Sequence, residues 1–203
     1  TLGLLGMSCF ITAAALASPY PRLDPRQPLE RIAFGSCLDE EKTPPRWQTL
    51  LDRDPQLFMM LGDNVYADSV GIRDVGPDLV EMRRAYSALG TQPGFRDLRS
   101  KVPLLAVWDD HDYGLNDGGE ENPIKVEAKA IFADFFDVPV ADPMRARDGI
   151  YRAAIYGPPG RRVQIILLDT RWFRSPLKLT DQRNASGKQR FVPDDDPKKT
   201  MLG

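Results

Sequence analysis

Four clusters of side chains that could bind a metal ion each follow an apolar run of the sequence. They are Cys37, Asp63, residues 109–112 and Asp169. Carboxylates held close together raise one another's pKa, and a bound cation removes that cost and also gives the Cys37 thiolate a partner. A single Asp after a strand is commonly only a helix cap or a turn residue. The metal interpretation therefore depends on the four clusters lying together.

The sharpest motif is Gly62-Asp63-Asn64-Val65-Tyr66. Asp63 leaves the end of a predicted strand, and Gly62 permits a close turn there. Tyr66 follows three residues later and can bring a phenolate, a strong ligand for ferric iron, back to the same point. The alternative is a tyrosine that only packs against the loop.

The chain has a single histidine, His111, among its 203 residues. This count excludes sites that need several imidazoles from this chain, including the HExxH class. A lone histidine is usually an ordinary core or surface residue. His111, however, stands between Asp110 and Asp112 after a predicted strand, where we expect its pKa to rise and the ring to act as a proton donor.

Strands and helices alternate along the predicted fold. We expect strands at residues 31–36, 57–61, 102–108, 150–156 and 163–168. Residues 150–156 alternate like a hairpin strand, and residues 157–160 are expected to turn. We expect helices from Pro44-Pro45 to Pro55 and at residues 79–89, 93–98 and 124–136. Strands that are apolar on both faces favour a buried parallel sheet, so the fold class is α/β. Ligands in such sheets bind beyond the carboxyl ends of the strands, where the four clusters are predicted to share one edge.

The chain is expected to be cut at both ends. Residues 1–17 carry no charge and end in Ala15-Leu16-Ala17, which is typical of a partial secretory signal peptide. This predicts a secreted or periplasmic protein with no stable membrane span after cleavage, and the alternative is an anchor that is retained. Residues 18–30 are interpreted as a linker, 31–174 as the N-terminal part of a domain, and 175–203 as a long loop leading to a C-terminal half. The formal net charge of −2 gives no electrostatic case for a sequence-specific nucleic-acid partner.

Four motifs occur in a fixed order over residues 31–171: FGSC, LGDNVYAD, WDDHDYGLND and LLDTR. Together they resemble the N-terminal half of the alkaline phosphatase D-type (PhoD-like) metallophosphatases. The resemblance implies an αββα sandwich, here incomplete and limited to the first half of the central sheet. It also implies a binuclear metal centre that hydrolyses phosphate mono- and diesters outside the cytoplasm, with a metal-bound hydroxide as nucleophile.

The resemblance also implies a role for each matching position. Asp63 would bridge both metals, with Cys37 and Tyr66 completing the ligands of Fe³⁺. Asp110 would bind the second metal, expected to be Ca²⁺, although carboxylate-rich sites accept other divalent ions. His111 would protonate the leaving group or hold the phosphate. The remaining candidates for support of the site or substrate contact are Asn64, Asp109, Asn116, Asp169 and Arg171.

Further ligands of that family, including a His-containing motif, belong to its second half. We therefore expect the isolated chain to bind metal weakly and to hydrolyse little. The alternative is a non-catalytic module, either decayed or truncated, that survives as a binding or structural piece. The joint presence of Cys37, Asp63, Tyr66 and His111 argues against decay.

Overall fold

The computed structural model describes residues 18–40, 47–67, 78–180 and 191–203. The predicted signal peptide at residues 1–17 lies outside these ranges. Within them, no helix has both the length and the apolar character needed to cross a membrane.

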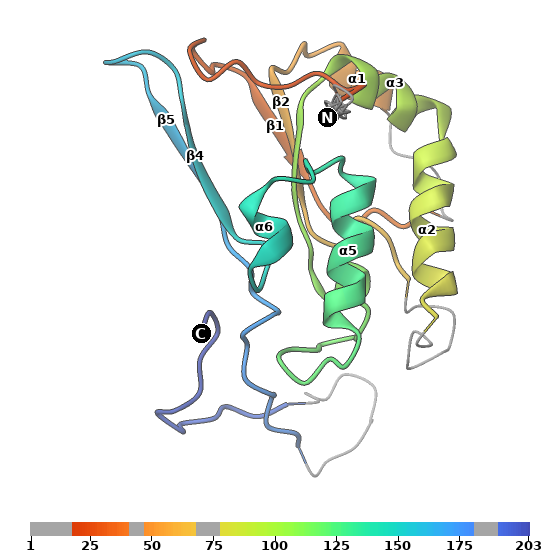
Figure 1. Cartoon of the computed structure of the whole chain (residues 1–203), viewed down its shortest axis with the longest axis vertical. Helices are drawn as coiled ribbons and strands as arrows, with labels where there is room; N and C mark the ends of the chain where they lie inside the picture. The colour runs from red at the N-terminus through yellow and green to blue at the C-terminus, as the bar shows by residue number, and fades with distance from the viewer. Residues whose placement is uncertain (1–17, 41–46, 68–77, 181–190) are drawn as a thin grey trace, which may run out of the picture.

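Three of the predicted strands form one parallel sheet (Figure 1). They are β1 (Ile32–Gly35), β2 (Leu57–Leu61) and β3 (Leu104–Val107), in the order β1-β2-β3. Ile32 pairs with Leu57, and Phe58 pairs with Leu104, so all three strands end at the same edge. The α/β class and the shared edge for the first three clusters are therefore confirmed.

Helices cover one face of this sheet. Those that follow predicted patterns are α1 (Trp47–Leu51), α2 (Val80–Thr91), α3 (Pro93–Lys101) and α5 (Lys125–Phe135). In Figure 1, α2 and α5 stand side by side along the sheet. Their buried faces meet β2 and β3 in a core that includes Met82, Phe95, Trp108 and Phe132. Two short helices, α4 (Asp110–Tyr113) and α6 (Pro143–Ala146), were not predicted, because four residues carry too little periodicity to be recognised.

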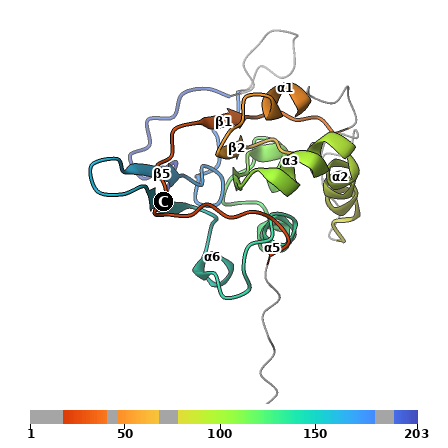
Figure 2. The same cartoon turned by 90° about the horizontal axis from the view of Figure 1, so that it is seen from above.

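The last two strands form a separate antiparallel hairpin, β4 (Arg152–Tyr156) and β5 (Val163–Leu167). The hairpin packs on the opposite face of the parallel sheet, where Ile165 and Leu167 share a small core with Leu57 (Figure 2). The expectation that residues 163–168 form a buried strand of the central sheet is therefore wrong. A turn at residues 157–160 sends the chain straight back along β4, so no crossover returns β5 to the first sheet.

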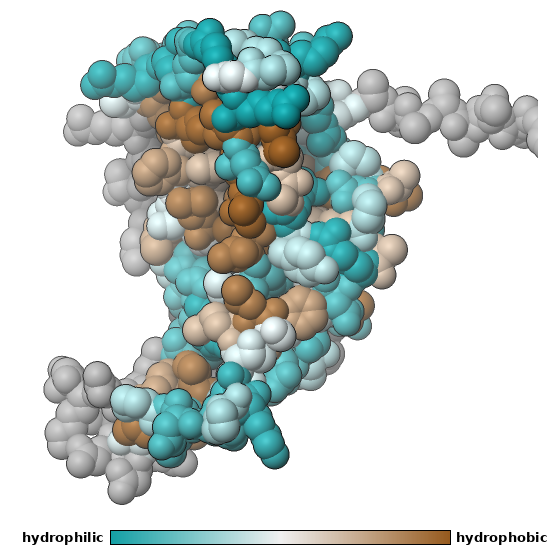
Figure 3. All heavy atoms as spheres, turned by 90° about the vertical axis from the view of Figure 1, so that its left-hand side faces the viewer, coloured by the Kyte–Doolittle hydropathy of each residue, from teal (hydrophilic) through white to brown (hydrophobic). Residues whose placement is uncertain are grey.

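The outer face of the hairpin is apolar and open to solvent. Ile155, Ile166 and Leu168 are each more than half exposed, and Figure 3 shows apolar side chains gathered on this side of the molecule. One helical layer and two strand layers are thus present, which fits an incomplete sandwich.

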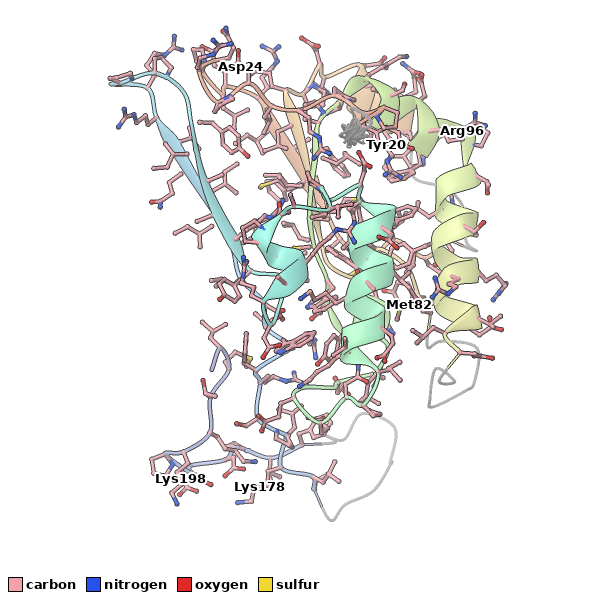
Figure 4. The ribbon with its side chains drawn as sticks, in the orientation of Figure 1. Tyr20, Asp24, Met82, Arg96, Lys178 and Lys198 are labelled. Carbon is pink, nitrogen blue, oxygen red and sulfur yellow. The ribbon has the colours of Figure 1, made fainter. Side chains whose placement is uncertain are left out.

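The segments at either end of the described chain are anchored. The ring of Tyr20 (labelled in Figure 4) lies with its centroid 3.8 Å from Cζ of Arg99 in α3. Leu29 is buried beneath the hairpin. Near the other end, two segments distant in the sequence meet, because the Ser175 N–H donates to Thr200 O at 2.9 Å. The division into a linker, a domain and a long loop stays a prediction.

Candidate metal centre

The loops after β1 and β2 are bound together by backbone hydrogen bonds at the sheet edge. The Cys37 N–H donates to Gly62 O at 3.2 Å, and the Leu38 N–H donates to Asp63 O at 2.7 Å. Cys37 and Asp63 have φ angles of 57° and 49°, in the left-handed region that non-glycine residues rarely adopt. Strain of this kind persists only where the surrounding structure holds it, and it is often found at functional sites.

Gly62 is required at this turn. Its φ is 100°, and a Cβ added there would lie 2.7 Å from Cβ of Asp109. Glycine therefore lets the backbone after β2 approach the residue that follows β3. This approach brings the side chains of the two loops within reach of one another.

The structure brings five predicted ligands and catalytic residues together. Candidate ligand atoms of Asp63, Asp110 and His111 all lie within 4.8 Å of one another. The thiol of Cys37 donates to Asp63 Oδ2 at 3.6 Å. The ring of Tyr66 stacks on that of His111, with centroids 4.2 Å apart. The group thus offers carboxylate and imidazole donors, and the Cys37 thiol and the Tyr66 phenol lie beside it.

The donor set fits a cation. Asp63 is 8% exposed, and its Oδ1 has no hydrogen-bond partner among the described residues. Burial raises the pKa of Asp63 above its ordinary value, and the nearby charge of Asp110 raises it further. A metal ion at Oδ1 would supply both the missing partner and the missing positive charge.

Tyr66 needs the same compensation. Its burial raises the pKa of the phenol, and the charge of Asp63 adds to this effect. The phenolate form is therefore disfavoured unless a cation binds beside it. The backbone N–H of Tyr66 donates to Glu40 Oε2 at 2.9 Å, which holds the loop in place.

Asp110 is set up differently from Asp63. Burial opposes its ionisation, but the Asp117 N–H, which donates to Oδ2 at 2.7 Å, and the charge of Arg171 outweigh that effect. The pKa of Asp110 therefore lies below its ordinary value. The site thus holds one readily ionised carboxylate and one that ionises at a cost.

Arg171 and Asp169 support the site from the loop after β5. Arg171 Nε donates to Asp109 Oδ1 at 2.5 Å, and its Nη2 lies 3.6 Å from Asp110 Oδ1. Asp169 accepts from Trp108 Nε1 at 3.0 Å and from the Ile150 N–H at 2.8 Å. Asp169 therefore reaches the sheet edge from the hairpin, even though its strand belongs to the second sheet.

Asn64 and Asn116 occupy opposite environments. Asn64 is buried and its Nδ2 donates to Val107 O at 2.8 Å, which ties the loop after β2 to the end of β3. Asn116 is exposed, and its side chain donates to Asp117 Oδ2 at 3.0 Å. The structure thus places Asn116 next to Asp117, whose backbone holds Asp110.

The sequence reasoning missed Glu40 and Arg174 near the site, and it assigned Asp112 no role of its own. Asp112 is fully buried, Glu40 binds the Tyr66 backbone, and Arg174 Nη2 donates to Gly118 O at 2.8 Å. The three-residue spacing of Asp109 and Asp112 is a signal for a capping box, which α4 has. Glu40 and Arg174 carry no sequence signal, because their partners are backbone atoms distant in the chain.

Comparison with known proteins places the sequence in a family. The sequence model of the PhoD-like phosphatases matches residues 32–203. A solved structure, described as the structure of PhoD, superposes with a TM-score of 0.64 at 18% sequence identity. That match covers 91% of this chain, which spans 38% of the other, and at this identity it shows the fold alone. No match is found among curated proteins. On the family match, the chain belongs to the PhoD-like phosphatases.

Proposed function

We propose that this chain supplies one side of a two-metal centre that hydrolyses phosphate mono- or diesters. The observation that carries the proposal is the group of Asp63, Asp110 and His111, whose ligand atoms lie within 4.8 Å, with Oδ1 of Asp63 buried and lacking a hydrogen-bond partner among the described residues. Membership of a phosphatase family supports the reaction class.

The ligands divide between the two metals by donor type. Cys37, whose thiol donates to Asp63, and Tyr66 are the proposed ligands of a ferric ion, for which thiolate and phenolate are strong donors. Asp110 supplies hard oxygens suited to Ca²⁺ or another divalent ion. Asp63 contacts Cys37 and also belongs to the group with Asp110, so it is the proposed bridge. When bound, two such ions lower the pKa of water and neutralise phosphoryl oxygens.

The remaining residues are proposed to protonate the leaving group or to position the ligands. His111 gives a proton to the leaving alcohol oxygen or binds a phosphoryl oxygen, and the Tyr66 ring beside it limits rotation of the imidazole. Asn64, Asp109, Asp169 and Arg171 hold the loops, as their hydrogen bonds indicate. Asn116 remains a candidate for contact with the substrate at the rim.

We further propose that additional ligands complete the centre. The chain spans 38% of the solved PhoD chain that it resembles, and it contains one histidine. With the described donors alone, the metals are expected to bind weakly and turnover to be low. The uncharged stretch at residues 1–17 supports export to a secreted or periplasmic location.

A metal titration followed by an ester assay tests the proposal. The chain is titrated with Fe²⁺ under air and with Mn²⁺ as a divalent probe, and bound metal is measured by equilibrium dialysis, which retains weakly bound ions. We expect uptake by the native chain, and loss of that uptake in Asp63→Asn. Hydrolysis of a bis-aryl phosphate is then measured with the loaded chain and is expected to be slow and to disappear in the same variant.

A matched control is Asp142→Asn, which alters a carboxylate that caps α6, away from the cluster. This variant should take up metal like the native chain. Metal uptake that survives Asp63→Asn contradicts the assignment. Absence of uptake by the native chain favours the non-catalytic module.

A further inference from the structure

Asp112 is buried deepest among the acidic side chains of the site. It is 0% exposed, and its carboxylate lies against N–H groups from both loops that carry the proposed ligands. From the loop after β2, Asn64 donates to Oδ2 through its backbone N–H at 3.1 Å and through Nδ2 at 2.5 Å. From the turn after β3, the Asp109 N–H donates to Oδ1 at 2.6 Å.

These three bonds connect the residues that adjoin the proposed ligands. Asn64 follows Asp63 directly, and Asp109 precedes Asp110 directly. One carboxylate therefore joins the backbone beside the bridging ligand to the backbone beside the ligand of the second metal. The left-handed conformation of Asp63 is held on both sides, by the Asn64–Asp112 bonds and by the Leu38 N–H on its carbonyl.

Only a carboxylate suits this position. Both carboxyl oxygens of Asp112 accept hydrogen bonds from N–H groups, so three donors are satisfied at once. Burial raises the pKa of Asp112, and the hydrogen bonds from the Asp109 and Asn64 N–H groups act in the opposite direction. An Asn of the same shape has one acceptor oxygen, and its NH₂ group would face N–H donors from Asn64 or Asp109. Asp112 is 0% exposed, and Asp63 and Asp110 are each 8% exposed.

We infer that Asp112 is a positioning residue that fixes the distance between Asp63 and the Asp110–His111 pair by clasping the two strand-end loops. The inference deepens the proposed metal function and rests on it. Partners that orient metal ligands typically change metal affinity about 10–100-fold when they are replaced.

The test compares Asp112→Asn with Asn122→Ala in the full chain. Asn122 is equally buried, and its Nδ2 donates to Tyr113 O at 2.8 Å, but it does not join the two loops. Mn²⁺ affinity and thermal stability are measured for both variants. We expect Asp112→Asn to weaken Mn²⁺ binding by about tenfold or more, and Asn122→Ala to change it less than about threefold at a comparable loss of stability. Equal weakening at equal loss of stability overturns the inference, as does unchanged affinity in Asp112→Asn.

Asn64→Ala serves as a second variant if Asp112→Asn fails to fold. This variant removes the hydrogen bond from Asn64 Nδ2 to Asp112 and keeps the carboxylate, so an intermediate loss of Mn²⁺ affinity is expected. An unchanged Mn²⁺ affinity would contradict the inferred role of Asp112. Amide hydrogen exchange of residues 64 and 109 in the metal-free chain provides a readout independent of metal. Both amides should be protected from exchange in the native chain and should exchange faster in Asp112→Asn. In Asn64→Ala, the amide of residue 109 should stay protected. If the native chain binds no Mn²⁺, the proposed function fails. Fast exchange of the amides of residues 64 and 109 in the native chain would instead overturn the inferred role of Asp112, independently of metal binding.

Discussion

The ring of Tyr66 stacks on the imidazole of His111, with centroids 4.2 Å apart and ring planes inclined by 31°. The two residues come from different loops, one after β2 and one after β3. Their stacking means that the phenol oxygen and the imidazole can be altered one at a time without separating the loops. This relationship makes the proposed ferric site open to selective tests.

Removing the phenol oxygen and the thiol should abolish the spectrum of the iron-loaded chain and leave the fold intact. Phenolate or thiolate bound to ferric iron gives a violet-brown absorption, and Tyr66→Phe combined with Cys37→Ser deletes both donors while keeping the stacked ring. The band is expected to vanish, with a change of less than about 1 kcal/mol in the free energy of unfolding of the metal-free chain. Visible absorption and urea unfolding check the two parts, and a band that persists contradicts the assignment of these ligands.

Asp63→Asn should stabilise the metal-free chain at neutral pH. Burial raises the pKa of Asp63, and the charge of Asp110 raises it further. Ionisation of Asp63 therefore lowers the free energy of unfolding at every pH above the pKa of the unfolded state, near 3.8. The variant is expected to gain about 1 kcal/mol at pH 7. Because the native carboxyl is protonated in acid, the gain should shrink as the pH falls toward 4. Urea unfolding across this pH range measures it, and a gain that grows in acid contradicts the assigned direction of the shift.

Replacement of Arg171 should destabilise the chain. Its side chain is 10% exposed and pairs with Asp109, whose side chain is 37% exposed, so solvent screens part of the interaction. Arg171→Met leaves that acid unpaired in a half-buried place and is expected to cost about 2 kcal/mol. Arg171→Lys keeps the charge but loses the planar fork, and should cost about half as much. A cost below about 0.5 kcal/mol for Arg171→Met in denaturant unfolding would show that the pair contributes little.

Shortening a side chain to alanine should have different effects on the two faces of the hairpin. Leu167 is 6% exposed and packs toward Leu57, whereas Ile166 is 60% exposed. Leu167→Ala is expected to lower the free energy of unfolding by about 2–3 kcal/mol, and Ile166→Ala by less than about 0.5 kcal/mol. Thermal and urea unfolding of the two variants compare them directly. Similar losses would contradict the packing of the hairpin on the parallel sheet.

Much of the fold follows from local patterns, and the errors have physical causes. The strand at residues 57–61 was predicted to the residue, because a continuous apolar run with turns at both ends leaves little choice. The hairpin strand at residues 150–156 and the turn at residues 157–160 are also confirmed. The placement of residues 163–168 in the central sheet is wrong, since an apolar run does not say which sheet it joins.

The site shows the same division. Cys37, Asp63, Tyr66, Asp110 and His111 come together because parallel strands end at one edge, which the sequence pattern predicts. Asp169 also comes close to the site, but through its bond to Trp108 rather than through the strand order that was expected. The link from Asp112 to the other loop was missed because Asn64 becomes its neighbour only when the two loops fold together.

Anomalous diffraction at the iron edge, from crystals of the chain grown with excess iron, would locate the proposed ferric site itself. We expect an anomalous peak between Cys37, Asp63 and Tyr66, at coordination distance from the thiolate and the carboxylate. The peak should be absent in Asp63→Asn crystals. Iron bound only at surface carboxylates away from β1 and β2, or no peak in the native chain, would contradict it.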